Sequence, residues 1–339
     1  MLKLFKAVSI FVGTIIGAGI FGVPYIINKS GVVPGFFYFL ILGGVVLLIH
    51  LFFGEALLRT KESCRLPGLA QKYLGAWGKI LVMISVVSGL VGALLAYLIL
   101  AGDFLSILFS PVSNLSAVQL TVIFWIVMSY LIFRGIKLIA SVELLTNIIF
   151  FLASAAVLFF CLPRFDFRNL AVFNLPNAFL PFGVILFSLI GWSAIPEIID
   201  FLKTPREKKK IKKTIILATL VTTPFYLIFT LAVLGVVGNN ISQDVLSSLA
   251  PFLGPKIIFL AVLAALVTLA DSILVLGLHL KNTFVCDLKL SNRLSTVIAC
   301  GSPFILFLIG FRDFIGTLGF VGTVVGVIEG IAIILIFKK

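Results

Sequence analysis

The stretch GTIIGAGIFGVPY, Gly13 to Tyr25, decides the fold of this 339-residue chain. It holds four glycines and one proline within an apolar segment near the N-terminus. Backbone groups inside a bilayer have no water to bond, so opening a membrane helix at mid-depth is costly. Two interpretations follow: a face of small residues for close helix packing, or a break in the helix that serves a function.

The composition is that of a polytopic helical membrane protein. The chain is 61% apolar and 12% charged, with a mean hydropathy of +1.26, whereas soluble domains are about 45–50% apolar and about 25% charged. Apolar runs of about 20 residues recur, and the roughly ten-residue alternating segments of a barrel are absent. We expect ten spans, at roughly 7–28, 34–58, 80–109, 118–133, 138–161, 178–200, 214–238, 256–280, 294–310 and 313–337.

Basic residues set the expected orientation. With the N-terminus inside, most of the 26 Lys and Arg residues fall in cytoplasmic segments, and the outer side holds Lys29, Arg164, Arg168, Lys256 and Arg312. This bias places both termini in the cytoplasm and the chain in the cytoplasmic (inner) cell membrane. The net charge of +13, concentrated in KTPREKKKIKK (203–213), therefore indicates a cytoplasmic loop and not a nucleic-acid surface.

Other features exclude further classes. The N-terminal apolar stretch continues to Ile27 without a convincing small-x-small cleavage site, so we interpret it as a retained first span. The four cysteines, Cys64, Cys161, Cys286 and Cys300, show no CxxC spacing. We therefore expect neither a disulfide framework nor a metal site, and no cofactor beyond a coupling ion.

A second break matches the first. In FSLIGWSAIPE (187–197), Gly191 precedes Pro196 by five residues, as Gly19 precedes Pro24. Spans one to three and spans six to eight begin roughly 171 to 180 residues apart. Because five spans is an odd number, the second half must be inverted relative to the first. The pattern predicts a single transmembrane domain built from two five-helix repeats, 1–165 and 166–339.

Four stretches together resemble one family. They are the opening stretch, LPGLAQKYLGAWGK (66–79) after the second span, GWSAIPEIIDFLKTPREKKKIKKTI (191–215), and DSILVLGLHLKNTFVCDLKL (271–290). In this order they resemble the bacterial aromatic amino acid (tryptophan/tyrosine) permeases of the amino acid/polyamine/organocation superfamily. The resemblance implies the LeuT-type 5+5 inverted repeat with helices 1 and 6 interrupted. Family members usually have an eleventh span, and a small hydroxyl residue where this chain has Asp271.

The breaks are the expected substrate site. Small residues let the backbone of span one open, and amides at the start of its second half suit a carboxylate. Polar backbone groups in span six can hold the ammonium, and Trp192 is either a pocket wall or a packed core residue. Small residues on span three leave room for a bulky side chain or pack closely. The expected substrate-binding residues are Gly17, Ala18, Gly19, Ile20, Phe21, Ser188, Ile190, Gly191, Trp192, Ser193, Gly92 and Ala96.

Asp271 marks the expected coupling site, because an intramembrane acid is functional by default. Thr268, Asp271 and Ser272 share one helix face. In the LeuT-type fold this face meets carbonyls of span one, here those of Gly13 and Ile16. The set suits Na⁺, and the same carboxyl could carry a proton; the alternative is a purely structural acid.

Further polar residues are candidates for gates or pathways. Glu143 and Asn147 lie four residues apart on span five, where a structural contact is the alternative. Glu197 is a candidate inner gate, and Tyr97 a cap on the pocket. We read Glu329, Asp103 and His279 as interfacial, with a proton-path role the alternative for His279, and Glu55 as an ion-pair partner of Arg59.

These observations predict a secondary active transporter of amino acids, aromatic or large and neutral, working by alternating access with proton or sodium coupling. One alternative is an amino-acid-sensing receptor on the same fold, like the membrane subunits of spore germinant receptors. A membrane-embedded enzyme would need at least two converging catalytic groups, and one strong intramembrane acid is found. The partners expected are an amino acid and the bilayer, and no nucleic acid.

Overall fold

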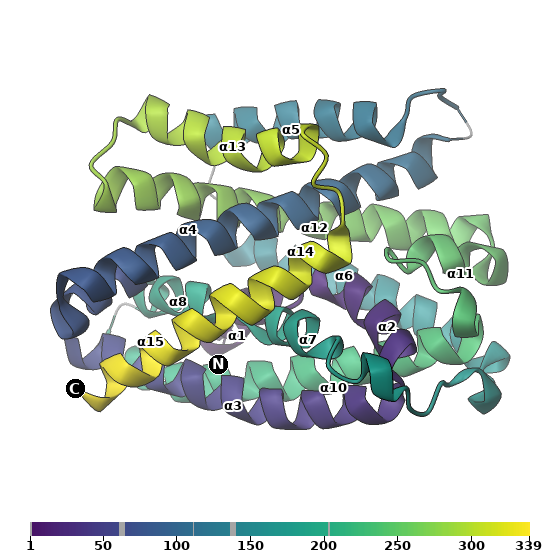
Figure 1. Ribbon diagram of the computed structural model, residues 1–339, viewed down its shortest axis with the longest axis horizontal. Helices are drawn as coiled ribbons and strands as arrows, with labels where there is room; N and C mark the ends of the chain where they lie inside the picture. Colours follow the sequence, from purple (N-terminus) through teal and green to yellow (C-terminus); the bar gives the residue numbers. More distant parts are fainter. Residues whose placement is uncertain (1, 61–64, 111, 136–139, 203) are drawn as a thin grey trace.

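The protein is a bundle of long helices, seen here in a computed structural model (Figure 1). The structure describes residues 2–60, 65–110, 112–135, 140–202 and 204–339, with the side chains of all these residues except 2, 140–143 and 286. No strand occurs in the described residues. Eight helices there are long and apolar enough to cross a membrane, or nine if the bent pair at the N-terminus counts as one span.

The helices follow the apolar runs of the sequence. Those of the first half are α1 (Leu2–Ile15), α2 (Gly19–Ser30), α3 (Val32–Thr60), α4 (Leu66–Phe109), α5 (Ala117–Arg134) and α6 (Ala140–Cys161). Those of the second half are α7 (Pro181–Leu189), α8 (Ile195–Phe201), α9 (Pro205–Lys208), α10 (Ile211–Val237), α11 (Leu246–Leu253), α12 (Pro255–Asp287), α13 (Asn292–Leu308), α14 (Phe314–Phe320) and α15 (Val327–Lys338).

Short 3-10 and π segments complete the chain. The 3-10 turns are η1 (Leu162–Arg164), η2 (Phe167–Asn169), η3 (Leu175–Asn177), η4 (Trp192–Ala194) and η5 (Gly238–Asn240), and the π-helical segment η6 (Val321–Gly326) joins α14 to α15. At 17 residues, α13 is shorter than the other candidate spans. The expected count of ten spans therefore stays a prediction.

Both predicted interruptions are present. Helices α1 and α2 meet at an angle of 49° around residues 16–18. Helix α7 ends at Leu189, and the chain passes through Ile190, Gly191 and η4 before α8 begins. The sequence thus located both breaks to within two residues.

One expectation about a loop was wrong. Residues 66–79, predicted to follow the second span as a loop, are helical and belong to α4. Gly75 turns the chain within this stretch, with φ of 80° and ψ of −169°, a conformation that side-chain-bearing residues rarely adopt. The stretch therefore folds as a short helix that bends into the long membrane helix.

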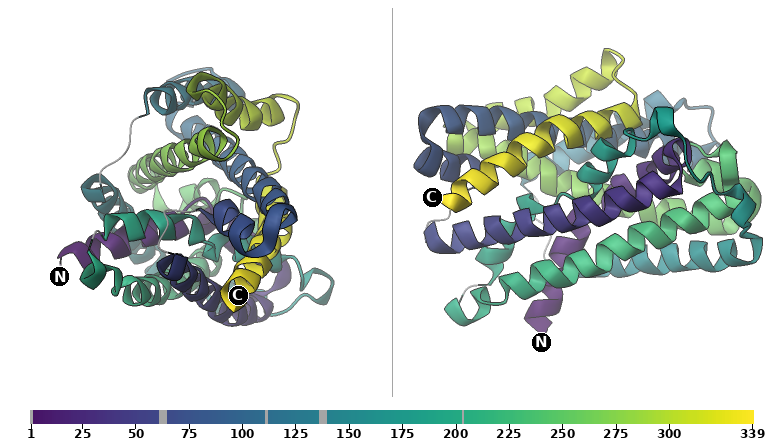
Figure 2. Two further views of the ribbon diagram at one scale, coloured as in Figure 1. Left: turned by 90° about the vertical axis from the view of Figure 1, so that its left-hand side faces the viewer. Right: turned by 60° about the horizontal axis from the view of Figure 1, so that its bottom comes forward.

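The interrupted helices occupy the centre of the bundle. Helix α1 packs against α6 and α10, α2 packs against α7 and α10, and α4 packs against α5, α12 and α15. Figures 1 and 2 show α5 and α13 together on one flank and α3 with α10 on the other. Helices α3, α4, α10 and α12 thereby surround the two breaks.

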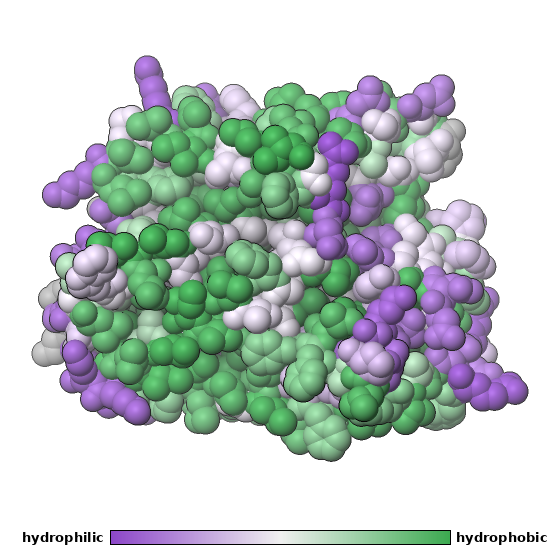
Figure 3. All heavy atoms as spheres, viewed as in Figure 1, coloured by the Kyte–Doolittle hydropathy of each residue, from purple (hydrophilic) through white to green (hydrophobic). Residues whose placement is uncertain are grey.

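The outer surface is apolar around the middle of the bundle. Figure 3 shows hydrophobic residues across the face, with hydrophilic ones gathered toward its ends. On α3, Phe36, Phe37, Leu40 and Ile41 are more than half exposed, an arrangement stable against lipid rather than water.

At the end where α4 begins, Glu55 pairs with Arg59, as predicted, and also with Lys212, at 3.2 Å each.

The N-terminus is held by an ion pair. Lys3 on α1 lies 2.6 Å from Glu207 on α9, and this pair connects the first helix to the segment that follows α8. Figure 2 shows the N-terminal end of α1 projecting from the bundle.

Candidate functional site: a cavity between two helix breaks

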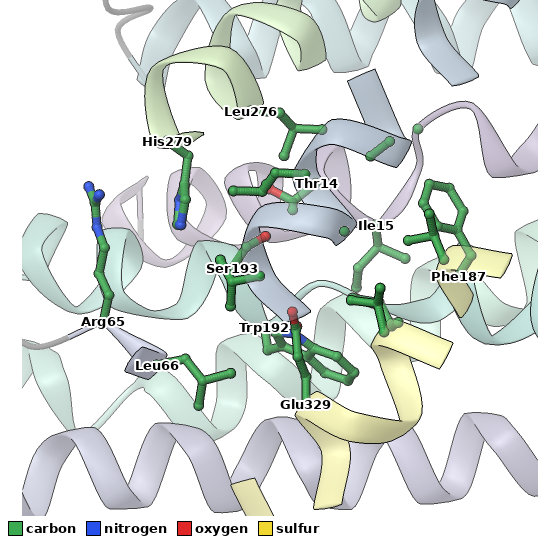
Figure 4. Close-up of a pocket in the computed structure, with 18 of the residues that line it drawn as sticks. Thr14, Ile15, Arg65, Leu66, Phe187, Trp192, Ser193, Leu276, His279 and Glu329 are labelled. Atoms are coloured by element: carbon green, nitrogen blue, oxygen red, sulfur yellow. The ribbon is translucent and has the colours of Figure 1, made fainter. Parts of the chain in front are cut away.

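The largest feature near the breaks is a cavity of about 110 Å³. Gly17 from the first break and Ile190, Trp192 and Ser193 from the second contribute to its wall. From there it extends to Arg65 at the start of α4 (Figure 4). The two interruptions therefore face one space, which leads to the end of the molecule where α4 begins.

The first break is stabilised from α10. The Tyr226 hydroxyl donates to the carbonyl of Ile15, the last residue of α1, at 3.0 Å. Tyr226 is fully buried, and its bond adds a second donor to the Ile15 carbonyl, which also accepts from the Gly17 amide at 3.0 Å. A polar side chain on a neighbouring helix thus compensates the interruption inside an apolar bundle.

The amides expected to bind a substrate carboxylate, those of Ile20 and Phe21, are not free. The amides of Ile20 and Phe21 donate to the carbonyls of Gly17 and Ala18, at 3.4 and 3.1 Å. They close tight turns at the start of α2 and are not open donors. The two amides expected to bind a carboxylate are therefore already bonded within the protein.

Tyr97 on α4 joins the first break to α12. Its hydroxyl lies beside the Ala18 amide and the Ser272 hydroxyl. A Cβ atom at Gly17 would collide with the same hydroxyl. Gly17 is therefore required by the close approach of a side chain. Tyr97, predicted to cap the pocket, lines both this cavity and a smaller one beside it.

His50 on α3 stabilises the second break. Its Nε2 accepts a hydrogen bond from the Gly191 amide at 3.0 Å, and its ring packs edge-on against Phe11 and Trp192. His50 is 1% exposed. Sequence reasoning missed this residue, although a lone histidine within an apolar span was a signal that could have found it.

Trp192 has the partner that a buried indole requires. Its Nε1 donates to Oε2 of Glu329 on α15. The interfacial placement of Glu329 was wrong, because this side chain is 7% exposed and lines the cavity. The side chain points inward, toward Trp192 of η4 (Figure 4).

The remaining wall comes mainly from small and branched apolar residues. Gly89 and Ala93 on α4 contribute to it, opposite Val321 and Val325 of η6. The predicted pair Gly92 and Ala96 lies outside the lining; Ala96 is buried and Gly92 is partly buried. The face of small residues on α4 does border the cavity, but through Gly89 and Ala93 instead of Gly92 and Ala96. Likewise Ala18, Gly19, Ile20, Phe21, Ser188 and Gly191 are buried at the breaks without lining the cavity.

A smaller cavity of about 30 Å³ contains the predicted coupling acid. Gly13, Asp271 and Ser272 line it together with Thr14 and Tyr97. Oδ2 of Asp271 accepts a bond from Thr146 on α6 at 3.1 Å, and Oδ1 is buried without a partner. Ile16 and Thr268 lie outside this lining, and the Thr268 hydroxyl donates to the Ala264 carbonyl.

The predicted pathway residues lie in different places. Asn147 donates to the carbonyl and hydroxyl of Ser9 at 2.9 and 3.0 Å, which fixes α6 to α1, and it lines the smaller cavity. Glu197 is exposed on α8 and does not line the larger one. The Glu143 side chain lies outside the described residues. His279, read as interfacial, is buried and lines the larger cavity. Of the four cysteines, the structure describes the side chains of Cys161 and Cys300, and both are buried and free.

Residues 2–286 match the protein family described as "Transmembrane amino acid transporter protein". The chain belongs to this family. The match covers both helix breaks, the larger part of each cavity wall and Asp271. The resemblance to amino acid permeases is thereby confirmed.

Among curated proteins, the chain is 28% identical over 247 residues to tyrosine-specific transport system 2 of Haemophilus influenzae, covering 70% of this chain and 59% of the relative. It is 24% identical to glutamine transporter 2 of Aliivibrio fischeri, covering 95% of this chain and 85% of the relative. The chain thus spans less than two thirds of the tyrosine transport protein.

A solved structure shares the fold. Mhp1, a nucleobase-cation-symport-1 family transporter in a closed conformation with bromovinylhydantoin bound, superposes with a TM-score of 0.68 at 15% identity, over 97% of this chain and 77% of Mhp1. At that identity the likeness shows the fold alone. These relatives and this neighbour are transporters, not enzymes.

Proposed function

We propose that the protein is a secondary active transporter that moves a neutral amino acid across the cytoplasmic membrane by alternating access. The observation that carries the proposal is that two helix breaks, far apart in the sequence, line one cavity inside an apolar bundle. Unwound backbone in a membrane is tolerated where it borders a cavity, and such breaks are typical transporter binding sites.

The breaks offer complementary groups to a zwitterion. The first break ends at the N-terminus of α2, where the helix dipole favours a carboxylate. Gly17 and Ile190 line the cavity from the two breaks, and their carbonyls are the proposed acceptors for an ammonium group. The apolar walls formed by α4 and η6 suit a large side chain.

The smaller cavity is the proposed coupling site. Asp271 has one oxygen bonded to Thr146 and the other without a partner, and hydroxyls of Thr14 and Ser272 share the cavity. Oxygen groups of this kind fit a small hard cation, and the carboxyl alone fits a proton. Because a carboxyl group is present, we favour a proton, with sodium as the alternative.

The relatives support the substrate class. Their names specify tyrosine and glutamine, two neutral amino acids. We further propose that both termini are cytoplasmic and that the halves 1–165 and 166–339 form an inverted repeat with ten spans. The cavity then opens to the cytoplasm through the region of Arg65, which corresponds to an inward-facing state.

Uptake into proteoliposomes tests the proposal. The purified protein is screened with the twenty amino acids, with and without a sodium gradient and at two pH values. We expect saturable uptake of at least one neutral amino acid that depends on one of the gradients. Specific binding without uptake under any gradient would overturn transport and favour a receptor on the same fold.

A further inference from the structure

Glu329 has one acceptor oxygen to which no described residue donates a hydrogen bond. Oε2 accepts the bond from Trp192, and no described residue donates to Oε1. Several other side-chain atoms are both fully buried and without a hydrogen-bond partner, but Oε1 of Glu329 is not one of these buried atoms. This oxygen is therefore accessible from the cavity that Glu329 lines.

The position of this oxygen is fixed from two sides. On one side the bond from the Trp192 indole, itself 3% exposed, holds the carboxyl group in place. On the other side, a Cβ at Gly89 would lie 3.8 Å from Oε1, within van der Waals contact, so this oxygen lies beside α4. Figure 4 shows the Glu329 and Trp192 side chains together, on the side of the cavity opposite Leu276.

The surroundings of Glu329 are apolar. Val321 and Val325 precede it at intervals of four residues, and all three line the same cavity. Leu90 and Ala93 border it from α4. A substrate whose backbone groups occupy the breaks would therefore extend its side chain along an apolar wall that ends at one acceptor.

We propose that Glu329 is a specificity-determining residue that accepts a hydrogen bond from the end of the substrate side chain. The substrate class is a neutral amino acid with an apolar or uncharged stem and a terminal donor, such as a phenol hydroxyl or a carboxamide. This inference rests on the proposed function and defines the substrate of that site.

A cationic side chain fits this wall less well. A lysine ammonium group could pair with Glu329, but the wall beside it, formed by Val321, Val325, Leu90 and Ala93, is apolar, and a buried charge needs several polar partners. A side chain without a donor, such as that of phenylalanine, leaves the buried acceptor without a partner, and sites of this kind discriminate strongly against such analogues.

Matched substrate pairs test the proposal in the full-length protein in proteoliposomes. The affinities of tyrosine and phenylalanine, and of glutamine and methionine, are compared by competition for uptake and by thermal shift. We expect the member with the donor to bind about tenfold or more tightly in at least one pair. Equal affinities within both pairs, or a preference for lysine over all four, would overturn the inference.

Glu329→Gln separates recognition from structure. Its single amide oxygen can still accept from Trp192, which leaves an NH₂ donor facing the cavity. We expect the preference for the donor-bearing substrate to fall severalfold, because the NH₂ group cannot accept from the substrate and can only donate to its oxygen. The other member of the pair should bind as before. Val325→Ala, on the same face, is the control and should weaken both members equally.

The outcomes distinguish this inference from the proposed function. If Glu329→Gln retains the wild-type preference, Glu329 is a structural partner of Trp192 and the inference is wrong, while transport stands. If Glu329→Gln does not fold, the pairs in the wild-type protein decide the question. If the wild-type protein takes up no amino acid under any gradient, the proposed function itself fails.

Discussion

Single polar residues with half-satisfied side chains surround the two breaks. His50 uses Nε2 to accept from Gly191, and its Nδ1 is buried without a partner. Asp271 and Glu329 likewise each have one oxygen bonded to the protein and one that is not. An unsatisfied polar group inside a membrane protein costs free energy, and the roles proposed for Asp271 and Glu329 each supply a partner for the unused oxygen.

Asp271→Asn should uncouple transport. We expect gradient-driven uptake to fall at least about tenfold, because the intramembrane charge that responds to the ion is removed. Binding of the amino acid, measured by thermal shift, should remain. The variant keeps the size of the side chain, so a general loss of folding is not expected.

Asp200→Asn is the matched control, since Asp200 is an exposed acid on α8. It should transport at the wild-type rate. Undiminished uptake by Asp271→Asn under the same gradient would contradict the coupling role proposed for Asp271.

His50→Leu should destabilise the protein. The Gly191 amide loses its acceptor within the buried core, which is worth about 1–3 kcal/mol of the free energy of unfolding. Thermal unfolding in detergent measures the effect. His50→Gln places an oxygen near the position of Nε2 and should recover part of the loss; identical melting temperatures for both variants would show that the bond is dispensable.

The sequence predicted the surroundings of some single residues but not of others. The need of Trp192 for a partner and the convergence of Gly13, Asp271 and Ser272 follow from general rules and a family resemblance. Glu329 and His50 did not, because sequence distance gives depth in the membrane but not the rotation of a helix. Gly92 shows the same limit: a shift of three residues, to Gly89, decides which small residue borders the cavity.

Each helix break is stabilised by a hydrogen bond with a side chain from a neighbouring helix. Tyr226 on α10 supports the first and His50 on α3 the second. The sequence located both breaks because glycine and proline weaken helices regardless of context. Their supports come from distant helices, and the helical stretch 66–74 could not be seen because its bend depends on the backbone angle of Gly75.

Gly17→Ala should impair substrate binding. The added methyl group would meet the Tyr97 hydroxyl, so either Tyr97 or the break must shift. We expect the affinity for the transported amino acid to fall about tenfold, measured by competition for uptake. Gly44→Ala on α3 is the control, since nothing lies within 4 Å of its added Cβ; equal affinities in the two variants would refute this reading of the break.

The molecule as a whole follows from its hydrophobic pattern. Apolar runs predicted the long helices, and family motifs predicted a fold that the superposition on Mhp1 supports. The number of spans does not follow from the hydrophobic pattern alone, because α13 is short and α14 joins α15 through a π segment. Length and composition alone do not define such elements as spans.

Cysteine labelling tests the proposed orientation. In a variant without native cysteines, Arg168→Cys should react with a membrane-impermeant maleimide in intact cells, since Arg168 is 90% exposed on the proposed outer side. Lys209→Cys, in the basic loop after α8, should react only after permeabilisation. The opposite pattern would invert the topology.

The 49° bend makes α1 a lever. Its 14 residues give an arm of about 20 Å from the break to the N-terminus. A change of about 10° at the break would move the N-terminal end by about 3.5 Å, while Gly17 at the pivot stays nearly in place. Such a swing would separate Lys3 from Glu207, now 2.6 Å apart. An adjustment too small to see at the binding site is thus amplified at the surface, where ionic strength acts on it.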